Sequence, residues 1–153
     1  MAAPLPAVPV VRDAFSEQPF LVFWEITRAC ALACRHCRAE AQPRRHPDEL
    51  DEGEALRLVD QLAELAPPML ILTGGDPLMR RDVLAIARRA ADAGMRVGLS
   101  PSGTQRLVNF DFHAIRGAGV ERLSLSLDGA TEESARTLLD ATLPSVLETL
   151  AGN

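Results

Sequence analysis

Long apolar runs, a secretory leader and blocks of like charge are all missing from this sequence of 153 residues. No apolar run approaches the roughly 20 residues that a membrane-spanning helix needs, and the opening residues lack the basic segment of a leader. The net charge of -5 is spread without a long acidic or basic run. Because nucleic-acid and membrane-surface binding depend on basic clusters, we expect neither kind of partner. The sequence predicts a soluble, cytoplasmic protein.

Cysteine is also scarce: the sequence has 3 cysteines, and all lie within residues 30–37. An odd number so close together excludes the disulfide framework of a secreted domain and favours metal binding or redox chemistry. With 47% hydrophobic and 24% charged residues, the composition fits one globular domain. Residues 1–18 begin with a segment rich in Pro and Ala, so we expect them to be flexible. Residues 19–153 are expected to form the domain.

From residue 19 onward, short apolar runs alternate with longer helical patterns, which is typical of βα units. Strands are predicted at residues 20–26, 69–72, 95–99 and 122–127. Helices are predicted at residues 51–65, 81–93, 112–116 and 131–150, the last of them kinked by Pro144. Four strands with their helices predict an α/β protein with a parallel sheet and right-handed connections.

Chemically notable residues follow each of these strands. The cysteines follow the first, the turn GGDP the second, the segment SPSGT the third and LDG the fourth. In parallel α/β proteins the loops at the carboxyl ends of the strands form the ligand site. The sequence therefore predicts one shared site at that edge of the sheet.

The cysteine loop, residues 27–40 (TRACALACRHCRAE), places three thiols with three and then two residues between them. Soft thiolates select iron-sulfur clusters, zinc or copper(I). A cubane cluster normally takes four thiolates, so three leave one iron open to substrate or cofactor. Zinc is the alternative, with His36 or His46 completing a Cys3His site. Three buried structural cysteines fit poorly, because Arg35, His36 and Arg38 are interleaved with them.

The motifs resemble those of radical SAM enzymes, in which C-x3-C-x2-C follows the first barrel strand. WEITRACALACRHCRAEA, GGDPL and SLSLDGAT are most similar to radical SAM proteins with a SPASM domain, of the haem-biosynthesis and peptide-modifying type. The resemblance covers about residues 20–131. It implies a partial (β/α) barrel of about four βα units, a 4Fe-4S cluster and S-adenosylmethionine (SAM). It further implies reductive cleavage of SAM to a 5'-deoxyadenosyl radical, with an external electron donor of the flavodoxin or ferredoxin type.

The resemblance also implies roles for individual residues. Cys30, Cys34 and Cys37 ligate three irons, and the fourth iron chelates SAM. His36 lies against the adenine, the GGDP turn bonds the methionyl amino group, and residues after the third and fourth strands contact the ribose or carboxylate. The residues so assigned to SAM are His36, Gly74, Gly75, Asp76, Pro77, Ser100, Ser102, Ser126 and Asp128.

The GGDP turn has a simpler alternative reading. Glycines allow a backbone to approach a ligand closely, which suits SAM binding, but an ordinary strand-to-helix turn with Asp76 as the cap has the same sequence. Asp76 is also one methylene shorter than the glutamate that is commoner in the family. Its carboxylate therefore reaches less far toward SAM, which disfavours direct contact by the side chain.

The sequence reaches four βα units, where radical SAM cores usually have six, and it departs from the family near Glu132. We therefore expect a truncated core whose fourth strand is an exposed edge. Three functions stay open on this basis. They are a radical SAM enzyme, a catalytically silent iron-sulfur and SAM-binding module that a second chain completes, and a small zinc-binding protein. No substrate and no catalytic side chain is indicated.

Overall fold

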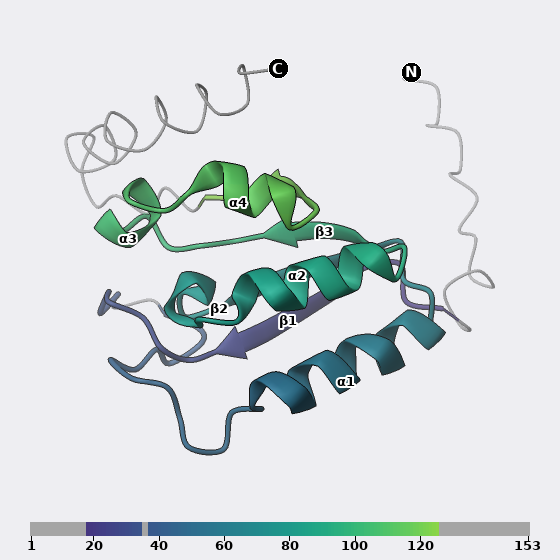
Figure 1. Cartoon of the computed structure of the whole chain (residues 1–153). Coiled ribbons are helices and arrows are strands. Elements are labelled where there is room, and N and C mark those ends of the chain that lie inside the picture. Colours follow the sequence, from purple (N-terminus) through teal and green to yellow (C-terminus); the bar gives the residue numbers. More distant parts are fainter. Residues whose placement is uncertain (1–17, 35–36, 126–153) are drawn as a thin grey trace, which may run out of the picture.

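The computed structural model describes residues 18–34 and 37–125, which alternate strands with helices (Figure 1). The elements in chain order are β1 (Val22–Thr27), α1 (Glu52–Glu64), β2 (Met69–Gly74), the 3-10 helix η2 (Pro77–Met79), α2 (Val83–Asp92), β3 (Arg96–Leu99), α3 (Gln105–Val108), α4 (Phe112–Gly117) and β4 (Val120–Leu123).

The sheet has the strand order β1-β2-β3-β4, and each neighbouring pair is parallel. One register row runs across all four strands through Val22, Leu70, Val97 and Val120. Right-handed connections between strands in sequential order place successive helices on the same face of the sheet. That is the arrangement of a (β/α) barrel, whereas doubly wound sheets reverse their strand order. The predicted parallel α/β fold, with four strands of a partial barrel, is confirmed.

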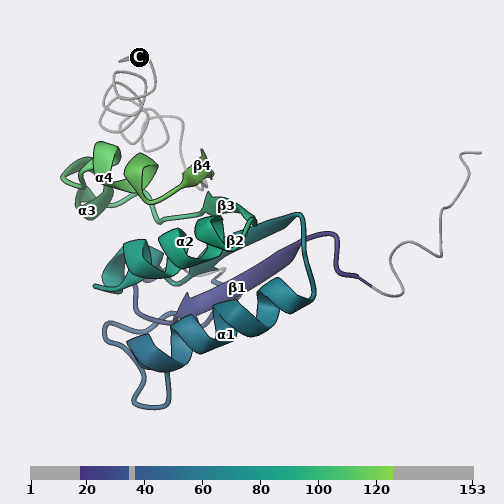
Figure 2. The ribbon, with the colours of Figure 1, turned by 45° about the vertical axis from the view of Figure 1, so that its right-hand side comes forward.

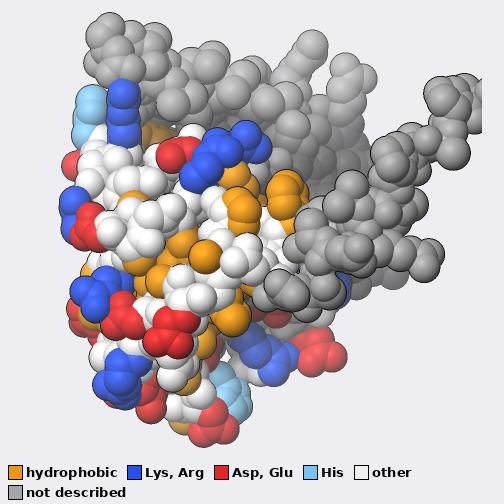
Figure 3. All heavy atoms as spheres, turned by 90° about the vertical axis from the view of Figure 1, so that its right-hand side faces the viewer, with side chains coloured by type: hydrophobic (Ala, Val, Ile, Leu, Met, Phe, Trp, Pro, Cys, Tyr) orange, Lys and Arg blue, Asp and Glu red, His pale blue; other side chains and the backbone are white. Residues whose placement is uncertain are grey.

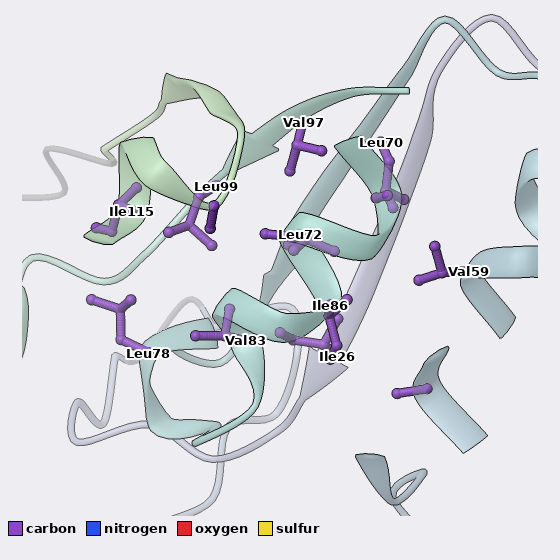
Figure 4. Packing of buried hydrophobic residues seen from close by; sticks show 14 of the residues in the cluster. Ile26, Val59, Leu70, Leu72, Leu78, Val83, Ile86, Val97, Leu99 and Ile115 are labelled. Atoms are coloured by element: carbon purple, nitrogen blue, oxygen red, sulfur yellow. The ribbon is translucent and has the colours of Figure 1, made fainter. Parts of the chain in front are cut away.

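The hydrophobic core lies between the sheet and its helices (Figure 4). The strands contribute Ile26, Leu70, Leu72, Val97 and Leu99, and the helices contribute Val59, Val83, Ile86 and Ile115. On β1 the alternate residues Phe23 and Glu25 are exposed, as expected when successive side chains point to opposite faces of a strand. The core is therefore on the helix-covered face.

Local sequence signals account for the limits of α1 and α2. Asp51 caps α1 in a capping box, in which its side chain accepts from Glu54 N at 2.8 Å and Glu54 Oε2 accepts from Asp51 N at 2.9 Å. The α1 helix ends before the proline pair at residues 67–68, as predicted. Gly94 follows α2 with φ +88°, a left-handed conformation that favours glycine. Both helices lie side by side across β1 (Figure 2).

Several boundaries differ from the sequence predictions; for example, β2 extends two residues further, to Gly74, and α2 begins two residues later, at Val83. β1 begins two residues later than expected, at Val22. β4 begins at Val120 rather than residue 122, because the chain turns at Gly119 with φ +82° and Val120 then pairs with Val97. The four-residue helix α3 was not predicted. Residues 126–127 of the predicted fourth strand and the predicted helix at 131–150 lie outside the described residues, as do residues 1–17 of the predicted flexible segment.

The strands begin at one end of the molecule and finish at the other. Figure 3 faces the end at which they begin, where hydrophobic side chains gather at the centre with charged side chains around them. The carboxyl ends of the strands lie on the opposite side, at the left of Figure 1. Among the described residues, no helix has the length and apolar character needed to cross a membrane.

Candidate functional site

The predicted site residues that the structure describes lie at the carboxyl edge of the sheet. Cys30 follows β1, Gly74 ends β2 and Gly75 follows it, and Ser102 follows β3. The Ser102 hydroxyl joins these three loops, since its Oγ lies 3.4 Å from Cys30 Sγ and donates to Gly75 O at 2.9 Å. Residues from three separate loops are thus in direct contact, as the strand-end argument predicts.

The cysteine loop is closed at its base by backbone hydrogen bonds. Cys30 N donates to Gln42 O and Gln42 N donates to Arg28 O, both at 2.8 Å. Together they form an isolated parallel bridge between Ala29 and Gln42. The two ends of the loop are therefore held together by the backbone itself.

The Arg28 side chain adds a second closure. Its guanidinium donates to Ala39 O at 3.3 Å, to Glu40 O at 3.1 Å and to the Glu40 carboxylate at 2.9 Å. Glu40 has φ +47°, the left-handed conformation that few residues other than glycine adopt. Arg28 thus bonds to the point at which the chain turns back toward β1.

The three sulfurs differ in exposure and in hydrogen bonding. Cys30 is buried and its Sγ accepts from Leu32 N at 3.4 Å, while Cys37 is partly buried and its Sγ accepts from Ala41 N at 3.5 Å. Cys34 is exposed, and its sulfur has no hydrogen-bond partner among the described residues. The loop therefore carries one sheltered, one intermediate and one open sulfur.

No three histidine, cysteine or carboxylate side chains in the described ranges are arranged as a metal site. The three sulfurs therefore do not meet at ligand distance in this structure. His46, the possible fourth ligand of a zinc site, is exposed, and its Nδ1 accepts from Asp48 N at 3.2 Å. His36, the other possible zinc ligand and the predicted adenine contact, lies outside the described residues.

The glycines of the GGDP turn pack against the cysteine loop. A Cβ on Gly74 would lie 2.2 Å from Thr27 O, and one on Gly75 would lie 2.5 Å from Ala29 O and 2.7 Å from Arg28 O. Gly75 N donates to Thr27 O at 2.8 Å and Asp76 N donates to Ala29 O at 2.7 Å. The close approach that these glycines allow is therefore to the backbone ahead of Cys30.

Asp76 is fully buried, and its carboxylate is used within the turn. Its Oδ1 accepts from Leu78 N at 3.1 Å and caps η2, and its Oδ2 lies 3.4 Å from the Thr104 hydroxyl, which donates to it. Burial raises the pKa of the Asp76 carboxyl, although hydrogen bonds from Leu78, Ser102 and Thr104 act in the opposite direction. Asp76 therefore caps η2, which is the role that the sequence offered as an alternative to SAM binding.

The remaining predicted SAM contacts fall into two groups. Pro77 is buried at the first position of η2, and Ser100 extends the sheet by donating from its backbone N to Leu72 O at 2.9 Å. Ser100 has no side-chain hydrogen bond among the residues described. Ser126 and Asp128, which follow β4, lie outside the described residues.

Sequence reasoning missed Glu49, whose carboxylate anchors the start of the cysteine loop. Its Oε1 accepts from the Thr27 hydroxyl at 3.0 Å, from Arg28 N at 2.8 Å and from His46 N at 3.2 Å, and its Oε2 accepts from Arg45 at 2.9 Å. Partial burial raises the pKa of this carboxyl, but the hydrogen bonds outweigh burial, so its pKa is lowered. No spacing motif marks Glu49, because its partners at the start of the cysteine loop, Thr27 and Arg28, are 22 and 21 residues away in sequence.

A second missed feature is the ion pair of Arg80 and Asp82, which lies between η2 and α2, just after the GGDP turn. Arg80 Nε donates to Asp82 Oδ1 at 2.9 Å, its Nη2 donates to Asp82 Oδ2, and its Nη1 donates to Ile26 O at 3.0 Å. Burial raises the pKa of the Asp82 carboxyl, yet the bonds from Arg80 outweigh it and the pKa is lowered. The pair connects the end of β1 to the start of α2.

The chemistry of the cysteine loop fits an iron-sulfur cluster. Its donors are thiols, which are the protein ligands of such clusters. Backbone N–H groups already point at the Cys30 and Cys37 sulfurs, and such hydrogen bonds are part of the surroundings that tune cluster ligands. Three cysteines would hold three irons and leave the fourth open.

Comparison with known proteins agrees with this chemistry. A sequence profile of the Radical SAM superfamily matches residues 24–151. A protein of Oleidesulfovibrio alaskensis named AdoMet-dependent heme synthase is 47% identical over 113 residues, which are 74% of this chain and 29% of that protein. A protein of the same name from Methanosarcina barkeri is 44% identical over 121 residues, 79% of this chain and 34% of that protein.

A more distant relative has another named activity. The PqqA peptide cyclase of Rhizobium meliloti is 31% identical over 117 residues, 76% of this chain and 31% of that protein. The chain therefore spans about a third of the length of these curated relatives. Because the superfamily profile matches most of the sequence, the chain belongs to the radical SAM superfamily.

Proposed function

We propose that this chain is the cluster-binding and SAM-binding part of a radical SAM enzyme. In the proposal Cys30, Cys34 and Cys37 ligate a 4Fe-4S cluster, and the open iron binds the amino and carboxylate groups of SAM. The residues proposed to line SAM are His36, Gly74, Gly75, Asp76, Pro77, Ser100, Ser102, Ser126 and Asp128. When bound, the cluster supplies the electron for reductive cleavage of SAM to methionine and a 5'-deoxyadenosyl radical.

One observation carries the proposal: the GGDP turn is bonded directly to the backbone that leads into Cys30. Gly75 N and Asp76 N donate to Thr27 O and Ala29 O, at 2.8 Å and 2.7 Å. A ligand on an iron beside Cys30 would therefore reach the turn without any rearrangement of the strands. In this role the chain's residues bind and orient SAM and exclude water from it.

The proposed division of the chain follows the sequence prediction, with residues 19–153 as a barrel core and residues 1–18 as a flexible segment.

Radical SAM enzymes generally need an external reductant, and we propose one of the flavodoxin or ferredoxin type. We also propose that further strands complete the barrel, since the curated relatives are about three times as long as the part matched here. A second chain is one source of such strands. The cytoplasm, where thiols stay reduced, suits this chemistry.

A tetrapyrrole is the substrate class that the relatives favour. Proteins named AdoMet-dependent heme synthase are 47% and 44% identical to this chain, and a pre-heme d1 synthase is 32% identical. The PqqA peptide cyclases, which are named for a peptide, reach 31% and 32%. Titrating the protein with an iron porphyrin tests this assignment, because binding should change the porphyrin absorbance. A peptide of similar mass, added as a competitor, is the control and should leave that change in place.

The central experiment is anaerobic reconstitution with iron and sulfide, followed by metal analysis and spin resonance with and without SAM. We expect close to four irons per chain, following the cubane chemistry, and a reduced-cluster signal that SAM perturbs. Replacing Cys30, Cys34 or Cys37 by Ala should abolish the cluster, because the sequence has 3 cysteines and no fourth thiol to substitute. His46→Ala is the matched control, and it should retain all the iron.

The other outcomes separate the alternatives. Stoichiometric zinc that His46→Ala weakens would contradict the proposal and favour a zinc-binding protein. A cluster that SAM does not perturb would reduce the chain to an iron-sulfur protein. If SAM perturbs the cluster but dithionite yields no 5'-deoxyadenosine by chromatography, the chain is a silent binding module rather than an enzyme on its own.

A further inference from the structure

We propose that the Ser102 hydroxyl serves the cluster rather than SAM: it donates a hydrogen bond to Cys30 Sγ when that sulfur ligates iron, and so raises the reduction potential of the cluster. In doing so it frees the carbonyl of Gly75, which belongs to the turn that the resemblance already assigns to the amino group of SAM, from its hydroxyl donor. This inference rests on the proposed function and gives Ser102 a different partner from the ribose or carboxylate that the resemblance implied.

Ser102 Oγ lies between two acceptors but has one hydrogen to donate. It donates to Gly75 O at 2.9 Å, and Cys30 Sγ lies 3.4 Å away on its other side. A thiol has a hydrogen of its own and can donate to the serine oxygen, so both contacts are satisfied in the protein without iron. An iron-bound thiolate has no hydrogen. A hydrogen bond between the same two atoms must then come from Ser102.

The shift of that hydrogen has a consequence for Gly75. Once the Ser102 hydroxyl turns to sulfur, the Gly75 carbonyl loses its hydroxyl donor. Gly75 N stays bonded to Thr27 O at 2.8 Å, so the turn keeps its place while the carbonyl accepts a new donor. An amino group that binds iron through its nitrogen lone pair keeps two N–H donors and cannot accept, and the neighbouring Asp76 carboxylate is buried and already bonded within the turn. The backbone carbonyl is therefore a suitable acceptor for the amino group.

The contact is also placed where a hydrogen bond to sulfur has an effect. Cys30 is 7% exposed, so water competes little for its sulfur. Within the described ranges, the other hydrogen bonds to cysteine sulfurs come from the backbone of Leu32 and Ala41. Reduction adds negative charge to the cluster and its sulfur ligands, so a donor at sulfur stabilises the reduced form and raises the potential.

The test compares the reconstituted wild type with Ser102→Ala and with Ser124→Ala as the control, since Ser124 is exposed after β4 and has no proposed role in the site. Redox titration followed by spin resonance gives the midpoint potential, and equilibrium dialysis with labelled SAM gives the affinity of the cluster-loaded protein. We expect Ser102→Ala to lower the potential and Ser124→Ala to leave it unchanged. The SAM affinity of Ser102→Ala should stay within about twofold of wild type, which is a difference below 0.5 kcal/mol at ~0.59 kcal/mol per natural-log unit.

A second pair of variants guards against disturbed folding. Ser102→Thr and Ser102→Val have the same shape and differ in the hydroxyl, so the threonine protein should have the higher potential. Equal potentials in that pair would overturn the inference. So would an unchanged potential in Ser102→Ala together with a loss of SAM affinity of about tenfold or more, because the hydroxyl would then serve SAM. A wild type without a cluster would overturn the proposed function itself, which the iron content shows separately.

Discussion

The Thr27 hydroxyl donates to the Glu49 carboxylate at 3.0 Å, although 22 residues separate the two in sequence. Thr27 is the last residue of β1 and is 1% exposed. Its Oγ also accepts from Ala29 N at 3.0 Å, so one hydroxyl links Glu49 to the residue just before Cys30. The direction in which the cysteine loop leaves the sheet therefore depends on a carboxylate that follows the loop.

We expect Glu49→Ala to lower the free energy of unfolding by roughly 2 kcal/mol, because part-buried donors at Thr27 and Arg28 lose a charged acceptor. Urea denaturation followed by circular dichroism measures the change. Glu40→Ala is the matched control, since Glu40 also bonds to Arg28 but its side chain is 83% exposed. It should cost no more than about 1 kcal/mol. Equal losses in the two variants would contradict the role of Glu49.

Acid should weaken the same contact. The pKa of the Glu49 carboxyl is lowered in the folded protein, so its stabilisation is complete above the ordinary carboxyl pKa of about 4.3. The stabilisation is lost as the pH falls through the lower, folded-state pKa, where the carboxylate must take up a proton. Unfolding free energies between about pH 6 and pH 3 should therefore fall less steeply in Glu49→Gln than in wild type. Parallel curves would show that another carboxyl dominates acid unfolding.

Gly75→Ala should displace the cysteine loop. Its Cβ would lie 2.5 Å from Ala29 O, so backbone must move, at a cost of about 1–3 kcal/mol. We also expect reduced iron uptake on reconstitution, since the displaced backbone leads into Cys30. Gly117→Ala is the control: a Cβ there meets nothing within 4 Å, and stability should be unchanged or slightly higher. Normal iron content in Gly75→Ala would show that the loop tolerates the shift.

Arg80→Met should be the most destabilising of these changes, by about 3–5 kcal/mol, because it leaves the Asp82 carboxylate buried without its partner. The side chains of Arg80 and Asp82 are 1% and 9% exposed. Arg89→Met provides the contrast, since Arg89 pairs with Asp60 in a similar two-pronged geometry but both side chains are about half exposed. That loss should be much smaller, because water and salt screen an exposed ion pair. Thermal unfolding of the two variants side by side measures the difference.

Local patterns predicted the helices and strands that have strong periodicity or clear end signals. The Asp51 and Glu54 capping box, the proline pair after α1 and Gly94 after α2 are all readable from neighbouring residues. The helix α3 was missed because its four residues make a single turn, too short for a hydrophobic period. The start of β4 was placed late because a β-branched residue after Gly119 is a weak signal on its own.

The sequence predicted which loops lie together, but it did not predict the contacts between them. Strand ends and motif residues located Cys30, the GGDP turn and Ser102 at one edge. The partners of these residues were not predictable, because the Gly75 contact with Ala29 and the Ser102 contact with Cys30 depend on how separate βα units pack. Glu49 and Arg80 were missed for the same reason: a charged residue in a loop or beside a helix has the same local pattern whether it is solvated or buried.

If the cysteine loop binds a cluster as proposed, the backbone bridge between Ala29 and Gln42 separates folding from cofactor maturation. Because hydrogen bonds from Cys30 and Gln42 already join the ends of the loop, the entropy of closing it is lost when the chain folds and not when iron arrives. Zinc fingers behave differently, since they fold only as the metal binds. We expect the apoprotein to persist as a folded pool with its thiols on a preformed loop. A cell recovering from iron limitation would then need to load this pool and would not need to synthesise it again.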